Sequence, residues 1–272
     1  MIIYKRTIEE IDIFVFIEKH LFIKERDIFE SIFNTFFMTD LPTEYHNGLL
    51  ITTTFETGVE YKDVFYCDIS NPSWVYMLIC FMESYFSRIT HSTVIHSSCI
   101  KLHNRVILFS GARLSGKSSL AKKMVEKYNA DFLADDFVFI VNKKIYGFRF
   151  PISMRFTSHD DHYFLQTKDL NQNTRYLYYV PGVFSLSKTI DLIIFPSYDS
   201  AKCNYINVRK IDKRHAFNNL MLNVKYFETN RDLLLDISMI AASAKAFYVE
   251  YNNVDCFGEY FNNFLVSESC NF

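Results

Sequence analysis

Two hydrophobic periods follow one another near the middle of the chain. Residues 106–109 are four consecutive apolar residues, and such a short run predicts a buried strand. Residues 120–128 then carry apolar side chains every three to four positions, which predicts an amphipathic helix. These apolar positions are Leu120, Ala121, Met124, Val125 and Tyr128. A segment with two glycines separates the runs, so the pattern predicts a strand, a loop and a helix in that order.

The same periods divide the rest of the chain into strands and helices. We expect strands at residues 49–55, 59–67, 92–95, 98–102, 132–134, 137–141, 192–195 and 246–251, and helices at residues 25–37, 70–86, 213–224 and 254–265. His103 and Asn104 predict a tight turn between two strands. This mixture is typical of the α/β class. We expect a small N-terminal α/β domain of unknown role over residues 1–90 and a second domain over residues 91–272.

Composition narrows the class of protein further. Hydrophobic residues make up 49% of the 272 residues, which is ample for a packed core. The net charge is −2 and no run of Lys or Arg exceeds two residues, so we expect no nucleic-acid partner. No apolar stretch approaches the length of a membrane span, and we expect a cytoplasmic protein with no membrane partner. The six cysteines form no C-x-x-C pair, which argues against a zinc site.

The loop between the predicted strand and helix has the sequence of a phosphate-binding loop. The chain has only 7 glycines, yet residues 111–118 read G-x-x-x-x-G-K-S. Backbone N–H groups of such a loop cradle a polyphosphate, Lys117 reaches the outer phosphates, and the Ser118 hydroxyl can ligate Mg²⁺. A glycine turn that merely caps a helix would leave both residues unexplained. The predicted nucleotide-binding residues are Gly111, Ala112, Arg113, Leu114, Ser115, Gly116, Lys117, Ser118 and Ser119.

An acidic pair follows the predicted helix. Asp135 and Asp136 end the strand at residues 132–134 and would face bound phosphates if that strand lies beside the strand at residues 106–109. Alternation along the strand would point the two carboxylates to opposite sides, so that one can hold a metal ion while the other accepts a proton. The alternative is a solvated turn between two strands.

These motifs together resemble the catalytic core of the HPr serine kinase family, which shares its fold with ATP-dependent phosphoenolpyruvate carboxykinases. The resemblance rests on His96-Ser97-Ser98, the loop at residues 111–118 and Leu133-Ala134-Asp135-Asp136, and it is sharp over residues 96–141. It implies an α/β fold with an HPr kinase-like P-loop core in residues 91–272. Residues 1–90 match no family.

The resemblance also implies roles for individual residues. Lys117 would bind the β- and γ-phosphates of ATP, and Ser118 and Asp135 would hold Mg²⁺. Asp136 would be the general base for the acceptor hydroxyl, with His96 beside the phosphates. Arg155 either stabilises the migrating phosphoryl group or is a surface residue. Without its place in this pattern, His96 would read as a core histidine.

The implied activity is transfer of the γ-phosphoryl group of ATP to a serine or threonine hydroxyl of a peptide or small protein. Two alternatives stay open: a kinase of a small-metabolite hydroxyl, and an ATP-sensing module without chemistry. Ser153 stands where the bifunctional relatives have a metal-binding glutamate, so we expect no reverse phosphorylase activity. A homo-oligomer is compatible with the resemblance. The run His159-Asp160-Asp161-His162 has metal-ligand residue types, but a polar loop is the simpler interpretation.

Overall fold

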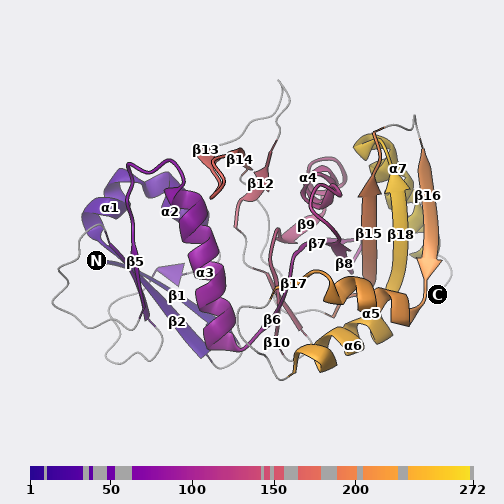
Figure 1. The fold of residues 1–272 in the computed structure, drawn as a ribbon, viewed down its shortest axis with the longest axis horizontal. Helices are drawn as coiled ribbons and strands as arrows, with labels where there is room; N and C mark the ends of the chain where they lie inside the picture. The colour runs from indigo at the N-terminus through magenta and orange to yellow at the C-terminus, as the bar shows by residue number, and fades with distance from the viewer. Residues whose placement is uncertain are drawn as a thin grey trace. The chain divides into compact units, whose positions relative to one another are not determined.

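The computed structural model has a mixed α/β fold (Figure 1). It describes residues 1–8, 11–32, 37–38, 48–52, 63–141, 144–147, 150–155, 165–178, 189–200, 205–225 and 232–269. The chain divides into two compact units. The first comprises residues 1–90 and 149–179, and the second comprises residues 91–148 and 180–272. Within the described residues, no helix combines the length and apolar character that crossing a membrane requires.

The first unit contains a five-stranded sheet in the order β3-β1-β2-β4-β5. Its strands are β1 (Ile2–Ile8), β2 (Ile11–Ile17), β3 (Phe37–Met38), β4 (Gly48–Thr52) and β5 (Asp63–Tyr66). β1 pairs antiparallel with β2 and β3, whereas β2, β4 and β5 are parallel. Alternate side chains of β1, β2 and β4 form one small core, which contains Ile3, Phe14, Phe16 and Leu50.

Three helices belong to the same unit: α1 (Lys19–Lys24), α2 (Arg26–Ile32) and α3 (Trp74–Thr90). The predicted helix over residues 25–37 is therefore too long, because Phe37 lies in β3 and pairs with Lys5. The predicted helix over residues 70–86 exists but begins at Trp74. Its start is displaced because the side-chain oxygen of Asn71 accepts the N–H of Ser73 at 2.9 Å, which forms a turn before the helix.

A second, three-stranded sheet of this unit has the order β12-β14-β13. It comprises β12 (Ile152–Met154), β13 (Leu165–Lys168) and β14 (Thr174–Tyr178). The turn between β13 and β14 is organised by Asp169, which is 4% exposed and accepts two hydrogen bonds from the Arg175 guanidinium, at 3.0 and 3.1 Å. Arg175 also lies over the Tyr76 ring of α3, 5.8 Å from its centroid.

The second unit is built on a six-stranded sheet in the order β16-β18-β15-β8-β7-β9. Its strands are β7 (Ser97–Leu102), β8 (Arg105–Ser110), β9 (Asp131–Ala134), β15 (Leu192–Tyr198), β16 (Ile206–Ile211) and β18 (Lys245–Tyr251). β8, β15 and β18 are parallel, and the other three strands pair antiparallel with their neighbours. The predicted turn at His103 and Asn104 joins β7 to β8, and both residues have positive φ as such a tight hairpin requires.

A smaller sheet, in the order β11-β10-β6-β17, belongs to the same unit. It comprises β6 (Thr93–Ile95), β10 (Val138–Val141), β11 (Lys144–Gly147) and β17 (Val224–Lys225). β17 pairs antiparallel with β6, so a segment more than a hundred residues away in sequence lies directly beside the residues that precede β7.

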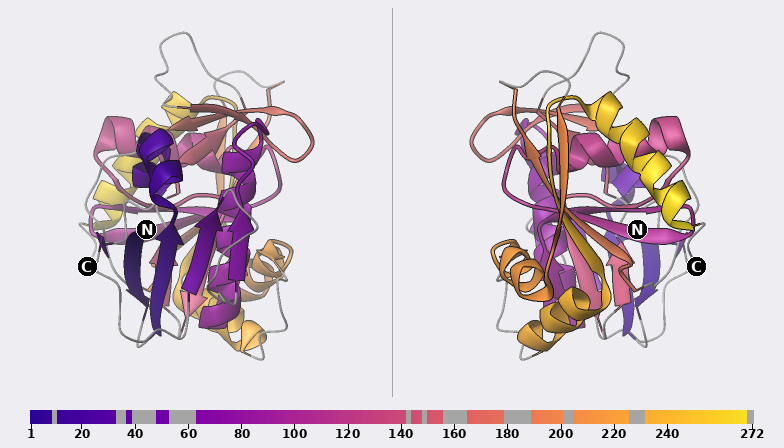
Figure 2. Two further views of the ribbon diagram at one scale, coloured as in Figure 1. Left: turned by 90° about the vertical axis from the view of Figure 1, so that its left-hand side faces the viewer. Right: turned by 90° about the vertical axis from the view of Figure 1, so that its right-hand side faces the viewer.

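Helices cover both faces of the six-stranded sheet. They are α4 (Lys117–Tyr128), α5 (Lys213–Met221), α6 (Leu233–Ser243) and α7 (Val254–Ser269). Leu108 of β8 belongs to a core cluster with residues of α5 and α6. The ring centroid of its neighbour Phe109 lies 6.2 Å from that of Phe261 in α7. Figure 2 shows α7 in yellow and α5 and α6 in orange on opposite sides of these strands. β8 is therefore buried on both faces, and its carboxyl end carries the predicted phosphate loop.

Replacing Arg175 by Leu should destabilise the first unit. The change leaves the buried Asp169 carboxylate without its cation, which costs about 3 kcal/mol of unfolding free energy. Arg26→Leu is the matched control, because it removes an exposed arginine and its ion pair with Glu30 in the same unit. Urea unfolding measures both variants. Equal effects of the two substitutions would contradict a structural role for the Asp169–Arg175 pair.

Candidate functional site

The predicted strand, loop and helix occur in the predicted order. β8 ends at Ser110, residues 111–116 form the loop, and α4 begins at Lys117. Gly116 has φ +92°, a left-handed conformation that glycine adopts without strain. A Cβ at this position would lie 1.8 Å from the Tyr251 hydroxyl oxygen. That hydroxyl donates to the Ser115 carbonyl at 3.2 Å. Tyr251 of β18 therefore contacts the loop directly and leaves no space for a side chain at Gly116.

Lys117 occupies the inside of this loop. It is 6% exposed, and its ammonium donates to the carbonyls of Gly111 and Ala112, both at 2.9 Å. Burial lowers its pKa, while the charges of Asp136 and Asp135 oppose that shift. The first turn of α4 carries no acidic residue and no side-chain cap at its Gly116 N-cap. Its backbone N–H groups and positive end therefore suit an anion.

The acidic pair follows β9 (Asp131–Ala134), the strand that we expected at residues 132–134. β9 pairs with β7 rather than with β8, so β7 lies between the acidic pair's strand and the strand of the loop. The condition that we set, a strand directly beside β8, is not met, because β7 and β8 form a tight hairpin and β7 fills that position. The acidic side chains nevertheless influence the pKa of Lys117 directly.

Asp135 is buried, with 3% exposure. The Ser98 hydroxyl of β7 donates to its Oδ1, whereas its Oδ2 has no hydrogen-bond partner among the described residues. Burial raises the pKa of Asp135 well above its ordinary value, and the neighbouring Asp136 charge adds to this effect. The hydroxyls of Ser98 and Ser118 and the ammonium of Lys117 act in the opposite direction. A buried carboxylate oxygen without a partner, beside a serine hydroxyl, is a position where a cation would be stabilised.

Asp136 has a different environment because the backbone turns sharply at this residue. Its φ is +62°, and the Phe137 N–H donates to the Asp135 carbonyl at 2.8 Å, which makes Asp136 the centre of a γ-turn. This turn, rather than the strand alternation that we expected, separates the two carboxylates. The Asp136 side chain is 32% exposed, and its Oδ1 lies 3.3 Å from Nε2 of His96.

The electrostatics of Asp136 and His96 are complementary. Burial tends to raise the pKa of Asp136, but the hydrogen bond and charge of His96 and the ammonium groups of Lys225 and Lys117 together hold it below its ordinary value. Burial lowers the pKa of His96, and the Lys117 charge contributes to this shift, while Asp136 opposes it. The Asp136 carboxylate is therefore ionised at neutral pH.

Lys225 is a residue of this site that sequence reasoning missed. Its ammonium lies 3.5 Å from the centroid of the Phe137 ring, and its charge lowers the pKa values of His96, Lys117 and Asp136. The pairing of β17 with β6 puts it there, together with a 2.8 Å hydrogen bond from the His96 N–H to the Asn223 carbonyl. Lys225 belongs to no motif, and the pairing joins segments that are distant in sequence. A single sequence gives no signal for it.

The other predicted residues lie in several places. Ala112, Arg113 and Leu114 are exposed on the loop, and Ser118 and Ser119 are half-buried on the first turn of α4. Arg155 follows β12 in the first unit, and its role stays a prediction. The His159-Asp160-Asp161-His162 run lies outside the described residues.

Comparisons with known proteins give distant structural likeness only. No family model matches the chain, and no curated protein matches it. Among solved structures, the chain is similar to the Hpr(Ser) kinase/phosphatase from Coxiella burnetii, with 10% sequence identity and a TM-score of 0.31, over 65% of this chain and 93% of that chain. This likeness is too distant to carry a functional argument.

Gly116→Ala should damage the loop. A side chain at φ +92° is strained, and its Cβ would overlap the Tyr251 hydroxyl, so we expect a loss of about 2–4 kcal/mol of stability. We also expect weaker ATP binding, measured by calorimetry. Tyr251→Phe in the same chain removes the overlapping hydroxyl and should restore part of the stability. An alanine variant with the stability and ATP affinity of the wild type would contradict this account of the loop.

Proposed function

We propose that the chain is an ATP- and Mg²⁺-dependent phosphotransferase that moves the γ-phosphoryl group to a serine or threonine hydroxyl of a peptide or small protein. One observation carries this proposal. The loop lysine, a buried carboxylate with an unpartnered oxygen and an ionised, accessible carboxylate converge at the carboxyl end of β8. A phosphotransferase needs a cation for the outer phosphates, a metal ligand and a base.

The residues around Asp135 fit a magnesium ion. Mg²⁺ prefers oxygen ligands and is commonly held by one or two protein groups together with substrate phosphates. Asp135 supplies an unpartnered carboxylate oxygen, and Ser118 supplies a hydroxyl beside it. The described residues contain no group of three or more His, Cys, Asp or Glu side chains that would hold a metal without substrate. When bound, Mg²⁺ would neutralise charge that develops on the transferred phosphoryl group.

The residues of this chain would then act in sequence during transfer. Lys117 exchanges its loop carbonyls for the β- and γ-phosphate oxygens and holds them at the start of α4. Asp136 accepts the proton of the acceptor hydroxyl while the hydroxyl oxygen forms its bond to the γ-phosphorus. The bond from that phosphorus to the bridging oxygen of ADP breaks with the electron pair leaving on ADP. His96 lies with Nε2 3.3 Å from the Asp136 carboxylate, and its hydrogen bond to Asp136 holds that base in position.

Two features favour chemistry over nucleotide sensing. Asp136 is held in a strained γ-turn, and such strain is concentrated at functional sites. The two acids also have pKa values that are shifted in opposite directions, so their environments suit different roles. A site that only binds ATP needs neither feature. The peptide or small-protein acceptor is proposed from the family resemblance of residues 96–141, and a metabolite hydroxyl is the alternative acceptor.

Substituting each acid separately should distinguish effects on the binding of Mg²⁺·ATP from effects on the rate of phosphoryl transfer. Asp136→Asn should keep Mg²⁺·ATP affinity and lose about 100-fold or more in transfer rate, because an amide cannot accept the hydroxyl proton. Asp135→Asn should instead raise the Mg²⁺ concentration that transfer requires. Labelled ATP with a library of Ser/Thr peptides, followed by mass spectrometry, provides the transfer assay. Normal transfer by both variants would show that the acidic pair is structural.

Lys225→Met should lower the rate of phosphoryl transfer strongly and the free energy of unfolding only slightly. The ammonium is positioned to stabilise charge at Asp136 and on the outer phosphates, so its loss should reduce kcat/KM by about 10- to 100-fold. Lys213→Met is the matched control, since Lys213 is exposed at the start of α5 in the same unit. If the two variants have the same kcat/KM, Lys225 has no part in the reaction.

A further inference from the structure

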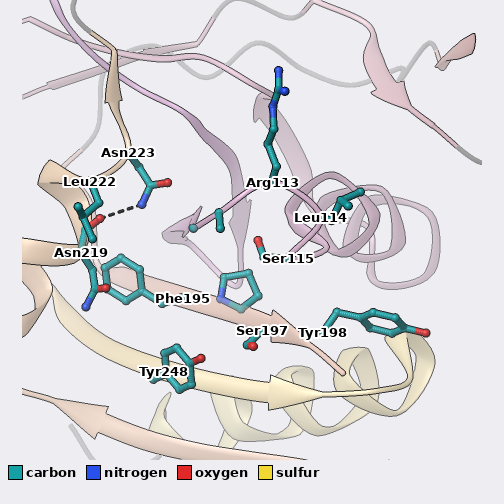
Figure 3. A pocket seen from close by; sticks show the side chains of 13 residues that line it. Arg113, Leu114, Ser115, Phe195, Ser197, Tyr198, Asn219, Leu222, Asn223 and Tyr248 are labelled. Atoms are coloured by element: carbon teal, nitrogen blue, oxygen red, sulfur yellow. Dashed lines mark hydrogen bonds between the residues drawn. The ribbon is translucent and has the colours of Figure 1, made fainter. Parts of the chain in front are cut away.

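A pocket of about 500 Å³ adjoins the phosphate loop on the β15 side of β8 (Figure 3). Loop residues 111–115 form one wall, the end of β15 at residues 195–198 forms another, and the last turn of α5 and Tyr248 of β18 complete it. All of these segments belong to the second unit. The volume lies within the range of roughly 300–1,000 Å³ that is usual for small-molecule sites.

The lining of this pocket suits a flat, partly polar molecule. Phe195, Tyr198 and Tyr248 supply aromatic rings, and Leu114 and Leu222 are large apolar side chains with 65% and 83% exposure at its edge. Exposed apolar side chains beside a pocket are positions where a ligand would remove surface from water.

Two asparagines give the pocket a directional polar group. The Asn219 amide nitrogen donates to the His215 carbonyl and the Asn223 amide nitrogen donates to the Asn219 carbonyl, both at 2.8 Å. These bonds fix the amides, as Figure 3 shows for Asn223, so their oxygens can accept from N–H or O–H groups of a ligand. Aromatic rings with fixed acceptors are the chemistry that recognises a nucleoside.

The sheet order determines which end of a nucleotide this pocket can receive. β15 lies on one side of β8, whereas β7 and then β9, which leads to Asp135 and Asp136, lie on the other. A triphosphate on the loop with its γ-phosphate toward Lys117 and the acids would therefore direct its nucleoside toward β15.

We infer that this pocket binds the base and ribose of the nucleotide and that the acceptor hydroxyl approaches from the side of the acidic pair. This inference rests on the proposed function, because it assumes that the loop binds a triphosphate. Asn223 contacts both the pocket and the acidic pair's side of the site. Its side chain lines the pocket, and its backbone carbonyl accepts the N–H of His96, which lies beside Asp136.

Comparing ATP with inorganic tripolyphosphate separates the pocket from the loop. Both contain the triphosphate, but only ATP can fill the pocket, so the wild type should bind Mg²⁺·ATP at least about tenfold more tightly. Ser197→Trp places an indole in the pocket and should weaken ATP binding by about tenfold while tripolyphosphate affinity changes less than about twofold. Unchanged tripolyphosphate affinity also shows that this variant is folded.

A second pair of variants avoids any change in the core. Leu222→Ser removes apolar surface from the edge of the pocket, and Leu234→Ser is the matched control, because Leu234 is 60% exposed in the same unit but does not line the pocket. Only the first change should reduce the preference for ATP over tripolyphosphate.

Each alternative result has a distinct meaning. If the wild type binds ATP and tripolyphosphate equally and Ser197→Trp alters neither affinity, the pocket inference is wrong while the proposed function stands. If Ser197→Trp raises the KM for the acceptor and leaves ATP affinity unchanged, the pocket is the acceptor site and the inference is again wrong. If the wild type binds neither ATP nor tripolyphosphate, the proposed function itself fails.

Discussion

The buried ammonium of Lys117 is the constraint on which the candidate site depends. A charge with 6% exposure is costly unless other groups compensate for it. The carbonyls of Gly111 and Ala112 accept its hydrogen bonds, and the Asp135 and Asp136 carboxylates supply the opposite charge. Lys117 lies at the end of the loop and the two acids follow β9, so the Lys117 charge is balanced only when the sheet places these two segments close together. A phosphate group placed here would replace the two neutral carbonyl acceptors of Lys117 with a charged acceptor, which forms stronger hydrogen bonds.

The two acids show how the backbone divides one local sequence into two environments. Asp135 is directed into the core beside Ser98, where burial raises its pKa, whereas Asp136 lies past a γ-turn beside His96 and Lys225, which keep its pKa low. Adjacent carboxylates that share one environment would compete for the same proton. The turn gives the two carboxylates different partners, although the Asp136 charge still raises the pKa of Asp135.

Local patterns predicted the parts of this site that are local in origin. The strand and helix around the loop follow from hydrophobic period, and Gly116, Lys117 and Ser118 follow from a motif whose chemistry needs those residue types. The helix over residues 25–37 was predicted too long because pairing of Phe37 with β1 overrides helical spacing. The neighbour of β9, the γ-turn at Asp136 and the position of Lys225 depend on pairing between distant strands or on backbone strain. No periodicity in a single sequence encodes them.

Equilibrium binding of Mg²⁺·ATP to the wild type and to Lys117→Ala tests the central claim most directly. Lys117 is the cation that the loop encloses, so its loss should weaken binding by at least about tenfold, while circular dichroism shows an unchanged fold. Isothermal titration calorimetry on both proteins gives the two affinities. A wild-type chain that binds no ATP, or an alanine variant that binds ATP as tightly as the wild type, would contradict the assignment of this loop to a nucleotide.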